Sequence, residues 1–126
     1  MNTTTATRIA AALGFLAVAL GAFGAHGLKA TLEVHGTVAI WEKAVFYHFI
    51  HTIMMFVLSE RWQVARVPWL CFFVGVLIFS GSLYLLALTN FRWLGAITPF
   101  GGVSFLVGWS CLVCGRFCGS GKNSPG

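Results

Sequence analysis

The sequence is poor in charged residues. They make up only 9% of its 126 residues, whereas hydrophobic residues make up 58%, and a soluble domain carries about 25% charged residues. Asp is absent, so the acidic groups are limited to Glu33, Glu42 and Glu60. A compact chain with so few charges cannot cover its surface with polar groups, and we therefore predict that lipid rather than water surrounds it.

Positive charge is not concentrated anywhere in the chain, although the formal net charge is +5. The basic residues stand singly between apolar runs and form no stripe that would bind phosphates, so we expect no nucleic-acid partner. A disulfide framework is also lacking, because three of the four cysteines fall inside apolar runs, where a free Cys behaves as a small hydrophobe. Cys111 and Cys114 have a C-x-x-C spacing but no flanking charge to activate a thiol, which favours packing over redox chemistry.

Long apolar runs are what the chain has in abundance. Four stretches reach the length of about 20 residues that crosses the hydrocarbon core as a helix. They cover about 9–26, 38–58, 67–89 and 93–115. Because backbone groups in lipid must bond within the segment, we predict an all-α, integral membrane, antiparallel four-helix bundle. It forms a single transmembrane domain over 1–126 and ends in a disordered tail at about 119–126.

The first apolar stretch has a second interpretation. A basic residue precedes it and small residues follow it, which is typical of a cleavable signal peptide. Its removal would leave an odd number of spans and half of a helix interface, so we favour a membrane span.

Basic residues also predict an orientation. One side of the bundle carries five of them: Arg8, Arg61, Arg66, Arg116 and Lys122. The other side carries three: Lys29, Lys43 and Arg92. Because Lys and Arg are enriched in cytoplasmic loops, we expect both termini on the cytoplasmic side.

Tryptophans lie near most of the predicted span ends. The rings of Trp41, Trp62, Trp69 and Trp93 are therefore predicted to mark the membrane interface, where amphipathic rings are enriched. Trp109 lies inside the fourth stretch and is predicted to pack against other helices.

Small residues form a stripe on two of the stretches. Membrane helices associate by close packing, which favours small residues at their interfaces. The stripe of the first stretch is Gly14, Ala17, Gly21 and Gly24, and that of the fourth is Gly101, Ser104, Gly108, Cys111 and Gly115. We predict that these faces touch either each other or another pair of helices.

A helix break is predicted within the fourth stretch. Pro99 removes a backbone hydrogen bond, and Gly101 and Gly102 make a bend inexpensive. Such breaks sometimes expose carbonyls that bind ions. A simple kink, with its free groups bonded by neighbouring residues or water, is the favoured interpretation.

Histidines are the only ionisable groups expected at depth. His48 and His51 lie one turn apart, on a face predicted to point into the bundle because a polar ring facing lipid is costly. The full stripe is Ala44, His48, His51, Met55 and Leu58. His26 ends the first stretch on the side where the second begins, so we predict that the three rings can approach one another.

This histidine face has two interpretations. The functional one is a metal, haem or quinone site, or a proton relay, since imidazole ligates metals and titrates near neutral pH. The structural one is a neutral ring that hydrogen-bonds across helices to a carbonyl, Ser or Thr. No carboxylate at depth can complete a proton pathway or a di-iron site, which argues against a pump, and we predict no cofactor.

Four motifs in order resemble the YgdD family, small bacterial inner-membrane proteins that are also known as domain of unknown function 423, with relatives among eukaryotic small transmembrane proteins. The motifs are Gly21-Ala-Phe-Gly-Ala-His26-Gly27, Tyr47-His-Phe-Ile-His51-Thr52, Phe79-Ser-Gly-Ser-Leu-Tyr84 and Thr98-Pro-Phe-Gly-Gly-Val-Ser-Phe-Leu-Val-Gly-Trp109. The resemblance extends from about residue 8 to 115. It implies a four-span protein of a bacterial inner (plasma) membrane with no established activity.

The resemblance also bears on the candidate residues. The chain matches the family at His26 and His51. Position 48 is not always His in that family, which weakens a metal site shared by His48 and His51, and the Cys111/Cys114 pair is not part of its pattern.

Together these features predict a structural or interaction protein. Its partners are the lipid bilayer and other membrane proteins or further copies of itself. The alternative is a binder or transporter of a small molecule or metal that uses His26, His48 and His51, with the break at Pro99 as a gate. We expect no enzyme, because no nucleophile, base and orienting group can be assembled from the sequence.

Overall fold

Helices account for the secondary structure of the described chain. The computed structural model describes residues 1–115, and within this range no β-strand occurs. The elements are α1 (Thr3–Ala25), α2 (Lys29–His35), α3 (Val38–Ser59), α4 (Arg66–Gly75), η1 (Val76–Ser80), α5 (Gly81–Thr89), η2 (Arg92–Ala96) and α6 (Thr98–Val113). The predicted all-α class is therefore confirmed, and the predicted tail at 119–126 lies outside the described residues.

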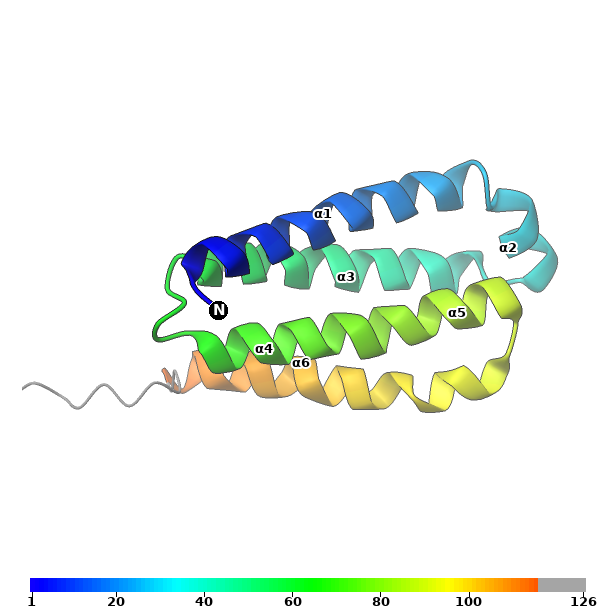
Figure 1. Cartoon of the computed structure of the whole chain (residues 1–126). Helices are drawn as coiled ribbons and strands as arrows, with labels where there is room; N and C mark the ends of the chain where they lie inside the picture. The colour runs from blue at the N-terminus through cyan, green and yellow to red at the C-terminus, as the bar shows by residue number, and fades with distance from the viewer. Residues whose placement is uncertain (116–126) are drawn as a thin grey trace, which may run out of the picture.

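The long helices lie side by side and reverse direction one after another (Figure 1). The chain runs along α1, turns through α2 and returns along α3. It then follows α4, η1 and α5 as one continuous rod and comes back along α6 (Figure 1). α3 has the largest number of neighbours, since it packs against α1, α2, α4, η1 and α5. α6 packs mainly against α4 and η1, so α3 is the central helix.

Among residues 1–115, three helical rods are long and apolar enough to cross a membrane. They are Thr3–Ala25, Arg66–Thr89 and Arg92–Val113. The second predicted span is present as α3, but α3 is not among these three. Its lower hydropathy has a physical reason, because its histidines face the protein interior and Glu42 and Lys43 lie near its first turn. Its polar rings therefore meet other helices, while its outer face stays apolar, with Phe46, Ile53 and Phe56 exposed.

Two boundaries differ from the prediction. α1 begins at Thr3, ahead of the apolar run, because the side chain of Asn2 caps the helix by accepting a hydrogen bond from the Thr5 N–H. The connection at 28–37 is not a loop throughout, since it contains α2. α2 ends at Gly36, whose positive φ of 66° is a left-handed conformation typical of a helix C-terminus.

The two small-residue stripes pack in separate helix pairs. On α1, a Cβ added at Gly21 would lie 3.3 Å from a methyl group of Val45, and one at Gly24 would overlap the indole of Trp41, so this stripe lies against α3. On α6, a Cβ at Gly101 would overlap the backbone of Phe79. The predicted contact therefore exists with other helices, and the two stripes are not each other's partners.

A π-helical turn interrupts the rod formed by α4 and α5. It covers η1, and the sequence pattern gave no sign of it. Ser80 in this turn is fully buried and donates a hydrogen bond of 2.8 Å to the Ala44 carbonyl of α3. The wider turn therefore presents a polar contact to the central helix, and π turns often occur at such special positions.

The predicted interface tryptophans divide into two groups. Trp93 is 65% exposed, as a ring at the membrane surface would be. Trp41, Trp62 and Trp69 lie near helix ends, as the sequence predicts, but their rings are buried against the protein. Their depth in a membrane stays a prediction. Each indole N–H has an internal acceptor, for example the Leu20 carbonyl for Trp41. A buried indole N–H needs a hydrogen-bond acceptor, and here each acceptor comes from another segment of the protein.

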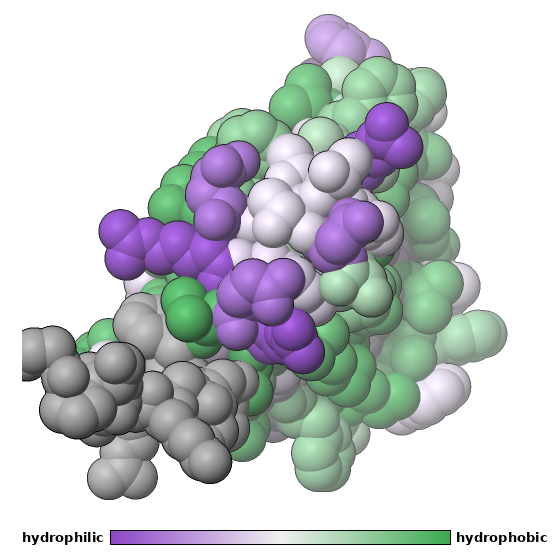
Figure 2. Space-filling model, turned by 60° about the vertical axis from the view of Figure 1, so that its left-hand side comes forward, coloured by the Kyte–Doolittle hydropathy of each residue, from purple (hydrophilic) through white to green (hydrophobic). Residues whose placement is uncertain are grey.

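Polar side chains gather at one end of the molecule, where the N-terminus and the α3–α4 connection lie (Figures 1 and 2). Exposed polar residues there include Asn2, Glu60, Arg61, Gln63 and Arg66. The flanks seen in Figure 2 are predominantly hydrophobic. Of the five basic residues predicted on this side, Arg116 and Lys122 lie outside the described residues.

Candidate functional site

The predicted inward face of α3 is confirmed. All five residues of its stripe are buried: Ala44, His48, His51, Met55 and Leu58. The two histidines nevertheless have different surroundings. His51 faces α4 and α6, where its ring contacts Phe72, Phe105 and Trp109. His48 contacts Tyr84 of α5.

His51 uses both ring nitrogens within the protein. Its Nδ1 lies 2.7 Å from the Tyr47 carbonyl one turn earlier on α3. Since a carbonyl only accepts, Nδ1 carries the proton and donates it. The lone pair of Nε2 then accepts the indole N–H of Trp109 at 3.0 Å. The ring also stacks on Phe105, with centroids 3.6 Å apart.

The consequence for His51 is chemical. A metal ligand must offer an imidazole lone pair, and the single lone pair of this neutral ring is already taken by Trp109. The ring therefore joins α3 to α6: Nε2 has the cross-helix partner that the structural interpretation requires, and Nδ1 is bonded within α3.

His48 is bonded on one side only. Its Nδ1 lies 2.9 Å from the hydroxyl of Tyr84, and the ring is 2% exposed. Its Nε2 is buried without a hydrogen-bond partner among the described residues, and the same holds for Oγ1 of Thr52, one turn further along α3. Ser80 and Tyr84 thus both contact α3, at positions one turn apart on each helix.

The structure does not bring His26 to the other two histidines. His26 is the exposed C-terminal cap of α1, and no hydrogen bond or ring contact joins it to His48 or His51. No group of three or more His, Cys, Asp or Glu side chains that could hold a metal occurs in residues 1–115. The expectation that the three rings approach one another is therefore wrong, because His26 ends its helix outside the protein interior.

The break in the fourth predicted span lies earlier than Pro99. Residues 92–96 form the 3-10 helix η2, and α6 begins at Thr98 with Pro99 in its first turn. At this position the missing N–H of Pro is unneeded in any case. Gly101 and Gly102 then lie inside regular helix. The segment from Pro99 to Gly102 therefore starts a helix and is not a kink within one.

Comparison with known proteins identifies the family. The family described as "Protein of unknown function (DUF423)" matches residues 20–102. The chain belongs to the DUF423 family. This confirms the resemblance that the four motifs indicate.

Relatives of this DUF423 protein carry names of one kind. A UPF0382 membrane protein of Staphylococcus saprophyticus is 48% identical over 107 residues, which cover 81% of this chain and 88% of that protein. The UPF0382 membrane protein YwdK of Bacillus subtilis is 44% identical over 105 residues, covering 78% and 84%. No solved structure matches the chain.

Two partners of the histidines in this DUF423 protein escaped the sequence analysis. Tyr84 and Trp109 were not among the candidate residues, although Trp109 was expected to pack inside the protein. A signal was nevertheless present, since Tyr84 ends the third of the quoted motifs and Trp109 ends the fourth. The motifs thus contain residues that hydrogen-bond to one another in the fold, which spacing along a single helix does not reveal.

Proposed function

We propose that this chain is a multi-pass protein of a bacterial cell membrane, crossed by α1, α3, the α4–η1–α5 rod and the η2–α6 segment as an antiparallel four-helix bundle. Both termini face the cytoplasm. Its role is that of a structural or interaction protein, without enzymatic activity. The names of the relatives, the three apolar rods and the hydrophobic flanks support the membrane location.

The observation that carries the proposal is the pairing of His51. Its two nitrogens are used by Tyr47 and Trp109, so this buried motif residue serves packing between α3 and α6. Two observations argue against the alternative, a histidine-lined site for a metal or small molecule: the lone pair of His51 accepts from Trp109, and His26 is exposed.

The hydroxyl groups support the absence of catalysis in the same way. Ser59, Ser80 and Ser104 each donate to a backbone carbonyl, of Met55, Ala44 and Cys71 respectively. None of them is bonded to a histidine that would act as its base. Ser80 and Ser104 therefore join helices, and Ser59 does so by accepting the indole N–H of Trp69.

The test is purification of wild type, His51→Ala and His26→Ala in detergent, followed by metal analysis, absorbance spectra and thermal unfolding. We expect all three proteins to be free of metal and haem. His51→Ala should unfold at a clearly lower temperature because it leaves a cavity and two unpaired groups. His26→Ala should unfold like wild type. A stoichiometric metal or haem in wild type that His51→Ala loses would contradict the proposal.

A further inference from the structure

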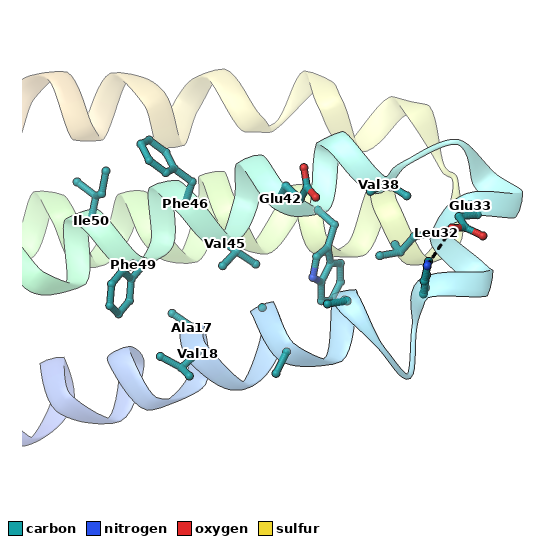
Figure 3. A pocket seen from close by; sticks show the side chains of 16 residues that line it. Ala17, Val18, Leu32, Glu33, Val38, Glu42, Val45, Phe46, Phe49 and Ile50 are labelled. Carbon is teal, nitrogen blue, oxygen red and sulfur yellow. Dashed lines mark ion pairs between the residues drawn. The ribbon is translucent and has the colours of Figure 1, made fainter.

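A groove of about 770 Å³ opens between the C-terminal half of α1 and the N-terminal half of α3 (Figure 3). Its volume lies within the range of about 300–1,000 Å³ that is usual for small-molecule sites. Glycines and alanines of α1 leave room on one side, and Val45 and Phe49 of α3 point toward α1 on the other (Figure 3). Much of the apolar lining, including Val18 and Phe46, is exposed, so the groove opens at the flank of the protein.

The length of the groove corresponds to one leaflet of a bilayer. Along α3 its lining extends from Val38 to Ile50, which is about 18 Å at about 1.5 Å per residue. Half of the hydrocarbon core is about 15 Å. In the proposed topology the groove begins at the membrane surface, beside the N-terminus of α3, and reaches the middle of the membrane. An acyl chain of one lipid molecule fits this path.

All charged groups of the groove lie at its outer end. Lys29 and Glu33 of α2 form a loose ion pair of 4.0 Å, and both side chains are mostly exposed. Glu42 of α3 lies in the same region and has no ion-pair partner in residues 1–115. The end thus offers two carboxylates and one ammonium, which repels an anionic head group and suits one with both a positive and a negative charge.

We infer that the groove binds a zwitterionic glycerophospholipid whose head group ends in a primary ammonium. The acyl chain lies between α1 and α3, the lipid phosphate pairs with Lys29, and the lipid ammonium pairs with Glu42 and Glu33. A primary ammonium donates hydrogen bonds to carboxylates, whereas a quaternary ammonium has no N–H. This inference rests on the proposed membrane location.

The experiment is native mass spectrometry of the full chain in detergent, with phosphatidylethanolamine, phosphatidylcholine or phosphatidylglycerol added at matched concentrations. Wild type should retain phosphatidylethanolamine saturably, at about one lipid per chain, and in preference to the other two. Ala22→Trp places a large ring in the groove from an exposed position and should abolish this binding. Glu42→Gln should weaken it about threefold, the effect of one exposed ion pair.

Matched variants separate the groove from the general apolar surface. Ala12→Trp adds the same ring at an exposed position of α1 outside the groove, and Glu60→Gln removes a carboxylate at the opposite end of α3. Both should bind lipid like wild type. Equal retention of phosphatidylglycerol or phosphatidylcholine, unchanged binding by Ala22→Trp, or a second copy of the chain covering the groove in a detergent-stable dimer would each overturn the inference.

Alkaline extraction of the membranes from which wild type is purified distinguishes the two proposals. If alkaline carbonate releases wild type from membranes, the proposed membrane location fails. If wild type stays in the membrane but shows no selective lipid, the lipid inference alone fails.

Discussion

At the scale of single residues, the contact between His51 and Trp109 makes the sharpest stability prediction. Trp109→Phe keeps an aromatic ring but removes the N–H that Nε2 of His51 accepts. A buried acceptor left unpaired costs about 1–2 kcal/mol, so we expect unfolding in detergent at lower denaturant concentration. Trp93→Phe is the matched control, because Trp93 is 65% exposed and its side chain has no hydrogen-bond partner within residues 1–115. It should change stability by less than about 0.5 kcal/mol. Equal effects of the two substitutions would contradict the role of this bond.

Thr52 is a position where removal of a polar group should stabilise the protein. Its hydroxyl is buried without a partner among the described residues, so the nearly isosteric Thr52→Val removes an unpaired polar group. We expect stabilisation by about 1 kcal/mol. Ser80→Ala, which removes the bond to the Ala44 carbonyl, should instead destabilise by about 1 kcal/mol. Thermal unfolding of both variants in one detergent is the measurement. Destabilisation by Thr52→Val would mean that its hydroxyl has a partner after all.

The limits of sequence reasoning at this scale are clear from the histidines. Helical spacing was enough to place His48 and His51 on the inward face, because periodicity fixes which residues share a face. It was not enough to find their partners. His48 pairs with Tyr84, and His51 pairs with Trp109, which is 58 residues away in sequence. Spacing on one helix carries no information on which neighbour lies opposite.

At the scale of helices, the contact between α6 and η1 depends on one glycine. A Cβ at Gly101 would overlap the backbone of Phe79, which cannot move aside as a side chain can. Gly101→Ala should therefore separate the helices and cost about 1–3 kcal/mol. The neighbouring Gly102→Ala is the control, since its Cβ would lie 3.8 Å from the ring of Phe79, an ordinary contact.

The two alanine substitutions should have different effects on the free energy of unfolding. Gly102→Ala gains helix propensity worth up to about 1 kcal/mol and should be neutral or stabilising. Thermal unfolding in one detergent measures both. If Gly101→Ala is as stable as Gly102→Ala, the close approach of α6 to η1 is not what the fold requires.

Irregular helix geometry was the least predictable feature of the elements. The small-residue stripes indicated close packing, and both are in contact with a neighbouring helix. The π turn of η1 left no mark in an apolar run, and its Ser80 contacts Ala44 of α3, a partner that local sequence does not reveal. Pro99 did mark an irregularity. Whether a proline kinks a helix or begins one depends on whether it lies inside the helix or in its first turn. η2 ends just before Pro99, so the residue begins α6.

At the scale of the whole molecule, α3 explains why hydropathy alone undercounts the proposed spans. It carries both buried histidines and is the helix with the most neighbours, so its polar groups meet protein where those of an outer helix would meet lipid. The interior is thus arranged around the least apolar of the long helices. The apolar surface that remains for lipid or partners is shared by all four segments, and α3 contributes to it through side chains such as Phe46, Ile53 and Phe56.

The proposed orientation of the protein in the membrane depends on a small difference in the number of basic residues. The predicted cytoplasmic side carries five basic residues and the opposite side three. Arg61 and Arg66 lie in or beside the short α3–α4 connection, and both are exposed. Replacing both with Ala leaves three basic residues on each side. Because Lys and Arg near the ends of membrane helices set topology, we expect the double variant to insert in both orientations.

C-terminal fusions measure this outcome. Wild type should fluoresce with a fluorescent protein and show no activity with alkaline phosphatase, which is active only outside the cytoplasm. The double Arg variant should give signal with both reporters. Replacing Lys29 and Lys43 with Ala changes the balance to five against one and should leave the wild-type pattern intact. If the phosphatase fusion of wild type is active, the proposed orientation is reversed. If the double Arg variant is as uniform as wild type, the orientation is set by something other than these charges.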